Sequence, residues 1–341
     1  MDWDLVEMLW EYTVVKRMGV NFEDHPILMT ETLMNTKSRR ERTLETLFET
    51  FHAPAAYLAK DVALASFSYG MCNTLAICIG SGTTSIAPIW EGYVLLKPSV
   101  VTKIAGDSID ALVHRILLEP KGIDQVPTSL HYERVVQNDG TQHLRRRNIC
   151  PTTSLIKYNQ HQILRDIKHT VVRVHNQPFD TKTYTHIPTN VYELPDGRVL
   201  DIGVERYLVG EALFNPNIGL GREVVFDLHN NFRFQGFHHH IKNVINACDP
   251  DLRKELFRNI IVCGGGSTIP DFNLRLEHEL GALLPPGVRC KVHNSYPIQS
   301  QCDAPWIGGS VLASLASLYH HWYTAQEYSE HGPNLLLRKC I

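Results

Sequence analysis

The segment 259–280, NIIVCGGGSTIPDFNLRLEHEL, decides the fold class of this chain. An apolar run ends at three consecutive glycines, and a charged helical pattern follows a Ser-Thr pair and a proline. Glycine lacks Cβ, so Gly264 and Gly265 can adopt positive φ and let another group approach the backbone. A strand, a glycine turn and a helix start aim N–H groups at one point, which suits a phosphate. The alternative is a plain strand-to-helix turn, because the pattern matches neither common nucleotide fingerprint.

A second strand and glycine turn occur at 74–95, TLAICIGSGTTSIAPIWEGYVL, where the pattern predicts a β-hairpin. Other apolar runs predict strands, and helical periodicities alternate with them, which indicates an α/β fold. The strands are expected at 25–31 and 53–59, and the helices at 1–19, 36–51, 60–70, 108–118, 161–174 and 306–324. In the first helix, Leu5, Met8, Leu9 and Tyr12 share one face. Because the two glycine turns follow strands in different halves, we expect two sheets facing one cleft, with Gly80–Gly82 near Gly264–Gly265.

Composition excludes several classes of protein. The chain has 341 residues, which predicts two domains or one bilobal unit. A net charge of −3 gives no overall attraction to nucleic acid or an anionic membrane. No apolar stretch approaches the ~20 residues of a membrane span, and the acidic start is not typical of a secretory signal. Eight cysteines without CxxC spacing favour free thiols in a reducing compartment, so we expect a cytosolic or nuclear protein.

A series of motifs along the chain carries a family resemblance. In order they are HPILMTE, FETFHAPAAYLA, PIWEGYVL, AGDSID, RDIK, YELPDG, ERYLVGEALFNP, CGGGSTIPDF, WIGGSVLASL and QEYSEHGP. With these motifs the chain resembles actin and the actin-related proteins over nearly its whole length. The resemblance implies an actin-like (actin/Hsp70-type ATPase) α/β fold, with two α/β halves around a cleft that binds ATP and a divalent cation.

The resemblance also implies that the first half is incomplete, because the family's first phosphate hairpin and its small subdomain would precede Met1. On this basis we expect residues 1–105 to form the remainder of the first half. Residues 106–303 would form the second half, and 304–341 would be C-terminal helices returning to the first half.

The nucleotide site implied by the resemblance keeps its glycines but loses its carboxylates. Cys78 and Ser81 stand where actin has the two aspartates of its second phosphate hairpin. Thiol and hydroxyl groups cannot supply the charge that holds a hard cation. Asp61 aligns with the glutamine that positions the attacking water, and Cys302 with the lysine that stacks on adenine. We therefore expect no ATP hydrolysis and no metal site.

Weak binding of ATP or ADP is the most that the retained residues imply. The alternative is that the glycines serve only the turns of the fold. The nucleotide-binding candidates are Gly80, Gly82, Gly106, Arg165, Lys168, Gly264 and Gly265.

A groove that accepts amphipathic helices of partner proteins is the second site implied by the resemblance. The alternative is ordinary packing of the C-terminal helix. The residues at the matching positions are Phe67, Trp90, Gly92, Ile307, Val311, Leu312 and Leu315.

Two polar runs have unremarkable interpretations. Adjacent histidines on a helix cannot converge on one ion, so His238–His240 predict a polar helix start and not a metal site. Arg145–Arg147 predict a solvated loop, with a contact to nucleic acid or an acidic partner as the alternative.

We expect an actin-like structural protein that is a subunit of a cytoskeletal or motor-associated assembly in the cytoplasm. The first alternative is a nuclear actin-related subunit of a chromatin-remodelling complex, and the second is an ATP-binding, polymerising actin. The expected partners are other proteins of an actin-family assembly. No membrane partner is expected, and nucleic acid would be involved only indirectly, if the protein is nuclear.

Overall fold

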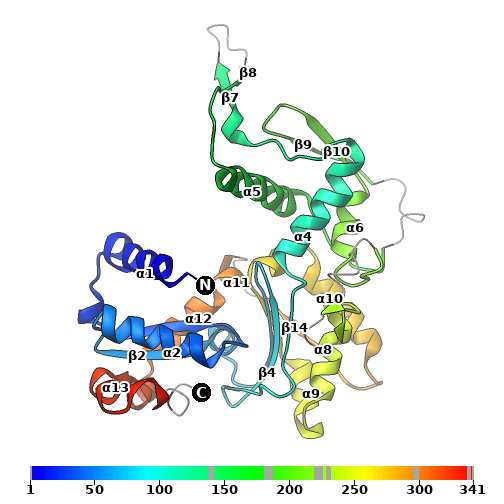
Figure 1. The fold of residues 1–341 in the computed structure, drawn as a ribbon. Helices are drawn as coiled ribbons and strands as arrows, with labels where there is room; N and C mark the ends of the chain where they lie inside the picture. Colours follow the sequence, from blue (N-terminus) through cyan, green and yellow to red (C-terminus); the bar gives the residue numbers. More distant parts are fainter. Residues whose placement is uncertain are drawn as a thin grey trace.

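The computed structural model describes residues 2–136, 142–179, 187–218, 226–227, 232–294, 299–335 and 339. Figure 1 shows two bodies built around separate sheets, with a helical and hairpin-rich part above the second body. No helix in the described part of the chain is long and apolar enough to span a membrane.

The first sheet is small and has three strands in the order β1-β2-β15. Strand β1 (Ile27–Glu31) runs parallel to β2 (Ala55–Lys60), and β15 (Tyr323–Thr324) pairs with β2 in the antiparallel sense. Around it lie α1 (Trp3–Glu11), α2 (Lys37–Glu45) and α13 (Ala325–His331). The α13 start is fixed by a capping box, in which Thr324 and Glu327 bond each other's backbone N–H. Strand β15 brings the C-terminal segment back to this first body.

The apolar face expected on the first helix does not face the core. Leu5, Met8, Leu9 and Tyr12 are all exposed, whereas Trp10 packs against the buried cluster on the opposite side. Helix α1 therefore carries apolar side chains on two faces, and the face that the periodicity identified is the exposed one.

The second sheet follows the order β14-β13-β3-β4-β5, with β6 also on β4. Its strands are β14 (Val292–His293), β13 (Ile260–Cys263), β3 (Thr74–Ile79), β4 (Thr84–Trp90), β5 (Tyr93–Val94) and β6 (Val100–Thr102). β3 and β4 form the predicted antiparallel hairpin, and β13 lies parallel to β3. Helices cover both faces, namely α3 (Asp61–Ser68) and α12 (Ala304–Ser314) on one side, and α8 (Phe237–Asn246), α9 (Pro250–Arg258) and α10 (Phe272–Leu283) on the other.

The two glycine turns lie close together, as expected, but the expectation that they face each other from separate sheets is wrong. Cys263 pairs with Cys78 in register, so both turns follow neighbouring parallel strands of one sheet. The boundary expected at residue 105 differs from the structure for the same reason, because β3 to β6 belong with β13. Residues 74 and 260 are far apart in the chain, and nothing local in the sequence shows that their strands pair.

The upper part contains α4 (Gly106–Val113), α5 (Thr153–Val171) and α6 (Glu205–Glu211). Two hairpins accompany them, β7 (Tyr132–Val136) with β8 (Gln142–Arg146), and β9 (Asn190–Glu193) with β10 (Val199–Ile202). The second hairpin turns at Gly197 with φ of +83°, as its Pro-Asp-Gly sequence predicts. The Arg145–Arg147 run belongs to strand β8 and its end, so the loop expected there is an exposed hairpin.

Three further elements are short. They are β11 (Phe226–Asp227), β12 (Phe232–Arg233) and α11 (Gln299–Cys302). The helix expected over 306–324 is interrupted, because Leu315 is extended with ψ of 128° and a 3₁₀ segment, Ala316–His321, follows. His238–His240 lie in the first turn of α8, which confirms the expected helix start, but His238 and His240 are buried, so this start does not face solvent. No cluster that could hold a metal ion occurs among the described residues.

Candidate functional site

The carboxyl ends of β3 and β13 form the floor of the candidate nucleotide site. Gly264 has φ of +87°, and a Cβ there would lie 2.4 Å from the Ile79 carbonyl oxygen. A Cβ on Gly266 would lie 2.2 Å from the Ile79 Cγ2. These glycines are therefore required because one turn packs against the end of the next strand. Only Gly265 faces open space, where an added Cβ would meet nothing within 4 Å.

The hairpin turn after β3 is held by the start of α4. The Gly106 N–H donates to the Gly80 carbonyl at 3.0 Å, and the Asp107 N–H donates to the Ser81 carbonyl at 2.8 Å. A Cβ on Gly106 would lie 3.2 Å from that Gly80 oxygen. Gly80 and Gly106 thus close a backbone contact between the two segments, and their N–H groups are partly used within it. Gly82 is exposed at the tip of the same turn.

Lys168 is engaged inside the protein. Its ammonium lies 2.7 Å from Asp110 Oδ1 and donates to the Gly106 carbonyl at 3.2 Å. Both side chains are buried, so removal of either charge would leave the other unpaired. This arrangement assigns Lys168 to the support of the turn.

A polar chain crosses the exposed tip of the hairpin. Ser81 Oγ donates to Asp107 Oδ1 at 2.6 Å, and Arg165 Nη2 donates to Ser81 Oγ at 3.3 Å. Asp107 places a carboxylate beside the turn that had lost its own, and sequence reasoning did not choose it. The signal was present, because Asp107 belongs to AGDSID, one of the motifs that carry the family resemblance.

The floor beside this turn carries thiols and one buried carboxyl group. Burial raises the pKa of Asp61 to about 6, although Asp61 Oδ1 accepts a hydrogen bond from the Val62 N–H at 2.8 Å. Cys78 and Cys263 are register partners on β3 and β13, and the neighbouring Cys78 side chain together with burial raises the Cys263 pKa well above its usual value. Cys302 lies close enough to contribute to the same effect.

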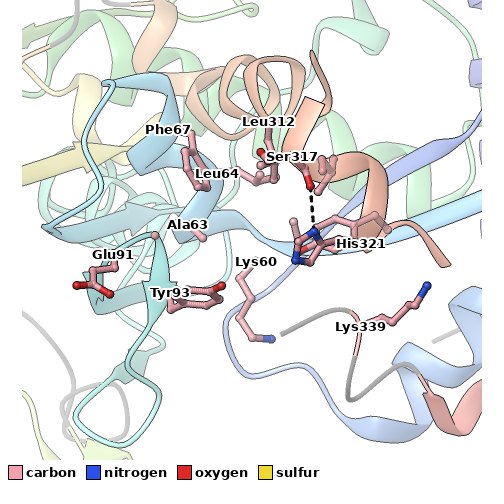
Figure 2. A pocket seen from close by; sticks show the side chains of 14 residues that line it. Lys60, Ala63, Leu64, Phe67, Glu91, Tyr93, Leu312, Ser317, His321 and Lys339 are labelled. Atoms are coloured by element: carbon pink, nitrogen blue, oxygen red, sulfur yellow. Dashed lines mark hydrogen bonds between the residues drawn. The ribbon is translucent and has the colours of Figure 1, made fainter. Parts of the chain in front are cut away.

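The second predicted site is a cavity of about 280 Å³ between α3, the β4–β5 turn and the segment after α12, shown in Figure 2. Phe67, Gly92 and Leu312 of the predicted groove line it. A Cβ on Gly92, whose φ is +82°, would lie 3.3 Å from the Phe67 ring. The close approach of this turn to the ring therefore shapes one wall of the cavity.

The other four predicted groove residues, Trp90, Ile307, Val311 and Leu315, do not line this cavity. Helical geometry explains the absence of Ile307 and Val311, because Gly308 meets the α3 backbone and Leu312 lies one turn further along the same row. Leu315 lies beyond the end of α12. Val311 and Leu315 are 41% and 44% exposed on the adjoining surface. The cavity is therefore lined by Phe67, Gly92 and Leu312 of the predicted groove, and on α12 it follows the row of Gly308 and Leu312 and not the row of Ile307 and Val311.

Sequence reasoning missed the polar residues around the cavity. Lys60 is buried and bonds Glu31 Oε1 at 2.9 Å, so its charge is already paired. His321 Nδ1–H donates to the Ser317 carbonyl at 3.1 Å, as Figure 2 shows. Lys339 is paired with Glu327. The cavity therefore combines apolar walls with a rim whose cations are mostly neutralised.

The sequence model of the family described as Actin matches residues 1–341. This chain belongs to the actin family. It is 37% identical to actin-related protein 4 of Arabidopsis thaliana over 344 residues, covering 99% of this chain and 77% of the relative. It is 32% identical to actin-related protein 4 of Schizosaccharomyces pombe, covering 99% and 82%. It is 29% identical to putative actin-29 of Dictyostelium discoideum, covering 100% and 78%.

The residues of this actin-family cleft do not fit the divalent cation that the fold implies. A hard cation needs several oxygen ligands, usually with carboxylates among them. Cys78 and Cys263 offer thiols in place of carboxylates, and Asp107 is the carboxylate that contacts the turn through Ser81. No metal-binding group of three His, Cys, Asp or Glu side chains exists in the described ranges. We therefore derive no metal-dependent step.

Proposed function

We propose that the protein is a non-catalytic actin-related subunit of a protein assembly, which holds an amphipathic helix of a partner in the cavity of Figure 2. The single observation that carries this proposal is the contrast between the two sites. The cavity has an apolar wall of Phe67, Leu64 and Leu312, whereas the cleft has thiols where a metal would need carboxylates. Apolar grooves of this kind accept helices through side chains at i, i+3, i+4 and i+7.

The experiment uses three variants of the tagged full chain, expressed in cells of its source and purified with its partners. Leu312→Ala and Phe67→Ala remove cavity walls, and Val311→Ala is the matched control on the same helix outside the cavity. We expect Leu312→Ala and Phe67→Ala to reduce co-purifying polypeptides by at least about 10-fold, the scale of a lost hot-spot contact. Val311→Ala should leave recovery unchanged. Equal recovery with all variants would refute the groove assignment.

Nucleotide chemistry should be absent, and nucleotide binding weak at most. Phosphoryl transfer requires a metal and an oriented nucleophile, and neither is supported by Cys78 or Ser81. Gly80, Gly82 and Gly265, with Arg165 nearby, leave a partial cradle for ATP or ADP phosphates. Phosphate release and equilibrium dialysis with labelled ATP separate the two questions. Turnover like that of actin would overturn this part of the proposal.

Two settings for the assembly follow from the sequence, a cytoplasmic cytoskeletal or motor-associated one and a nuclear chromatin-remodelling one. The exposed end of β8 supports the nuclear setting, because Arg145 and Arg147 share one carboxylate, Glu133, at 3.8 and 3.0 Å. A positive charge therefore remains on this projecting hairpin for an acidic partner. Imaging of the tagged protein distinguishes the settings, and exclusion from the nucleus would reject the second.

A further inference from the structure

Two cysteines, Cys78 and Cys263, lie side by side near the carboxyl ends of β3 and β13, and neither the proposed partner binding nor nucleotide binding uses them. Cys78 is the last residue but one of strand β3 and lies on the side facing α3 and α12, and Cys263 ends the parallel neighbour β13. The two residues are register partners, and parallel partners on adjacent strands point to the same sheet face. Cys263 belongs to a buried cluster with Val62 and Ala65 of α3, and Cys78 packs against the same cluster. The sheet itself therefore holds this pair together.

The backbone spacing is compatible with a covalent link. Neighbouring strands lie about 4.7–4.9 Å apart, which is within the usual Cα separation of roughly 4.4–6.8 Å in disulfides. The two residues already share a face, so a link requires side-chain rotation and little backbone movement. No other pair of the described cysteines is placed opposite one another on paired strands.

The two thiols differ in access. Cys263 is 0% exposed, while Cys78 is half-buried at the turn that opens on the cleft. A small oxidant can therefore reach Cys78 first, and Cys263 is available only to a group already at Cys78. Cys78 would thus act as the cysteine that attacks the oxidant, and Cys263 as the cysteine that resolves the oxidised Cys78 into a disulfide.

We propose that Cys78 and Cys263 form an oxidisable dithiol, which a peroxide converts to a disulfide linking β3 to β13. In the first step the Cys78 sulfur attacks hydrogen peroxide, its S–H proton and one peroxide oxygen leave as water, and a sulfenic acid remains. In the second step the Cys263 sulfur displaces the sulfenic hydroxyl, which leaves as water with the Cys263 proton. Two thiols and one peroxide give one disulfide and two waters, and the two electrons pass to the peroxide.

The test uses purified full-length protein, reduced, desalted and treated with stoichiometric hydrogen peroxide under native conditions. Free thiols are then blocked with N-ethylmaleimide, and the digest is analysed by mass spectrometry. We expect the Cys78–Cys263 linkage to be the main intramolecular product, reversed by dithiothreitol. Linkage only after addition of urea, or a main product that includes Cys302, would overturn the proposal.

Cys78→Ala and Cys263→Ala should each abolish the linkage, and Cys248→Ala is a matched control because Cys248 is buried and has no cysteine opposite it. Oxidation should raise the Tm of the wild type and the control by several degrees, because the link closes a long loop in the unfolded chain. A second measurement does not depend on the variants folding. Phenylarsine oxide, which needs two adjacent thiols, should protect one pair from N-ethylmaleimide in the wild type. Protection of no pair, or of another pair, would refute the assignment.

Discussion

Gly308→Ala tests the contact on which the groove depends. The α12 backbone at Gly308 lies against α3, and a Cβ there would sit 1.7 Å from the Leu64 carbonyl oxygen and 3.1 Å from the Ser68 nitrogen. Both are backbone atoms, so no side chain can move aside. Because heavy atoms normally approach to about 3.5 Å, the two helices would have to separate by about 2 Å.

The expected cost follows from overpacking at a rigid contact. Insertion of one methyl group into a packed core costs roughly 1–3 kcal/mol, and a backbone clash lies at the upper end, so we expect a loss of about 3 kcal/mol. Separation of α3 from α12 would also widen the cavity, since Leu64 and Phe67 belong to α3 and Leu312 to α12. Partner recovery should therefore fall together with stability.

Gly309→Ala is the matched control on the next residue. A Cβ there meets Leu28 Cδ2 at 3.4 Å and Leu64 Cδ1 at 3.6 Å, which is ordinary contact with side chains. Removal of a helix-interior glycine should then stabilise the protein by roughly 0.5–1 kcal/mol. Urea unfolding followed by circular dichroism measures both variants. Equal stability of Gly308→Ala and Gly309→Ala would refute the packing argument.

Three further predictions concern buried charges and pH. Arg275 is 1% exposed and donates two hydrogen bonds to Glu211, at 2.7 and 2.8 Å. Arg275→Met should therefore lower the free energy of unfolding in urea by about 3–5 kcal/mol. As a control, Arg198→Met at an exposed ion pair should lower it by less than ~1 kcal/mol. Burial lowers the pKa of His240 to about 4, so protonation favours unfolding and stability should fall from pH 6.5 to 4, by up to about 3 kcal/mol for this ring. His240→Gln should flatten that fall, and exposed His278→Gln should not. Burial raises the pKa of Asp61 to about 6, so its carboxylate destabilises the fold as pH rises from about 4 to 6. Asp61→Asn should therefore be more stable than wild type at pH 7.5 and equal at pH 4, and equal melts at both would contradict this.

Local signals in the sequence predicted most elements of the fold. The hairpin at 74–90 and the strands at 27–31 and 55–60 follow from periodicity and turn residues. The helix expected over 161–174 also exists, but it spans Thr153–Val171. The predictions that failed needed long-range information. Which face of α1 is buried depends on where Trp10 packs, and the pairing of β3 with β13 depends on segments far apart in the chain. Family resemblance supplied the groove region, but its centre was set by the helical row of Gly308 and Leu312.

The retained glycines at the cleft have a physical explanation that does not involve nucleotide. Gly264 and Gly266 are required by Ile79, and Gly106 by the backbone at Gly80. Any chain with this fold needs them, whether or not a phosphate binds, so they carry no information about chemistry. The packing of these turns does not restrict the side chains beside the glycines, and here Cys78 and Ser81 stand where the resemblance to actin implies two aspartates. The groove presents the opposite case, because Phe67 and Leu312 are apolar side chains at the wall of an open cavity. Side chains thus favour the groove over the cleft as the site of the proposed partner binding.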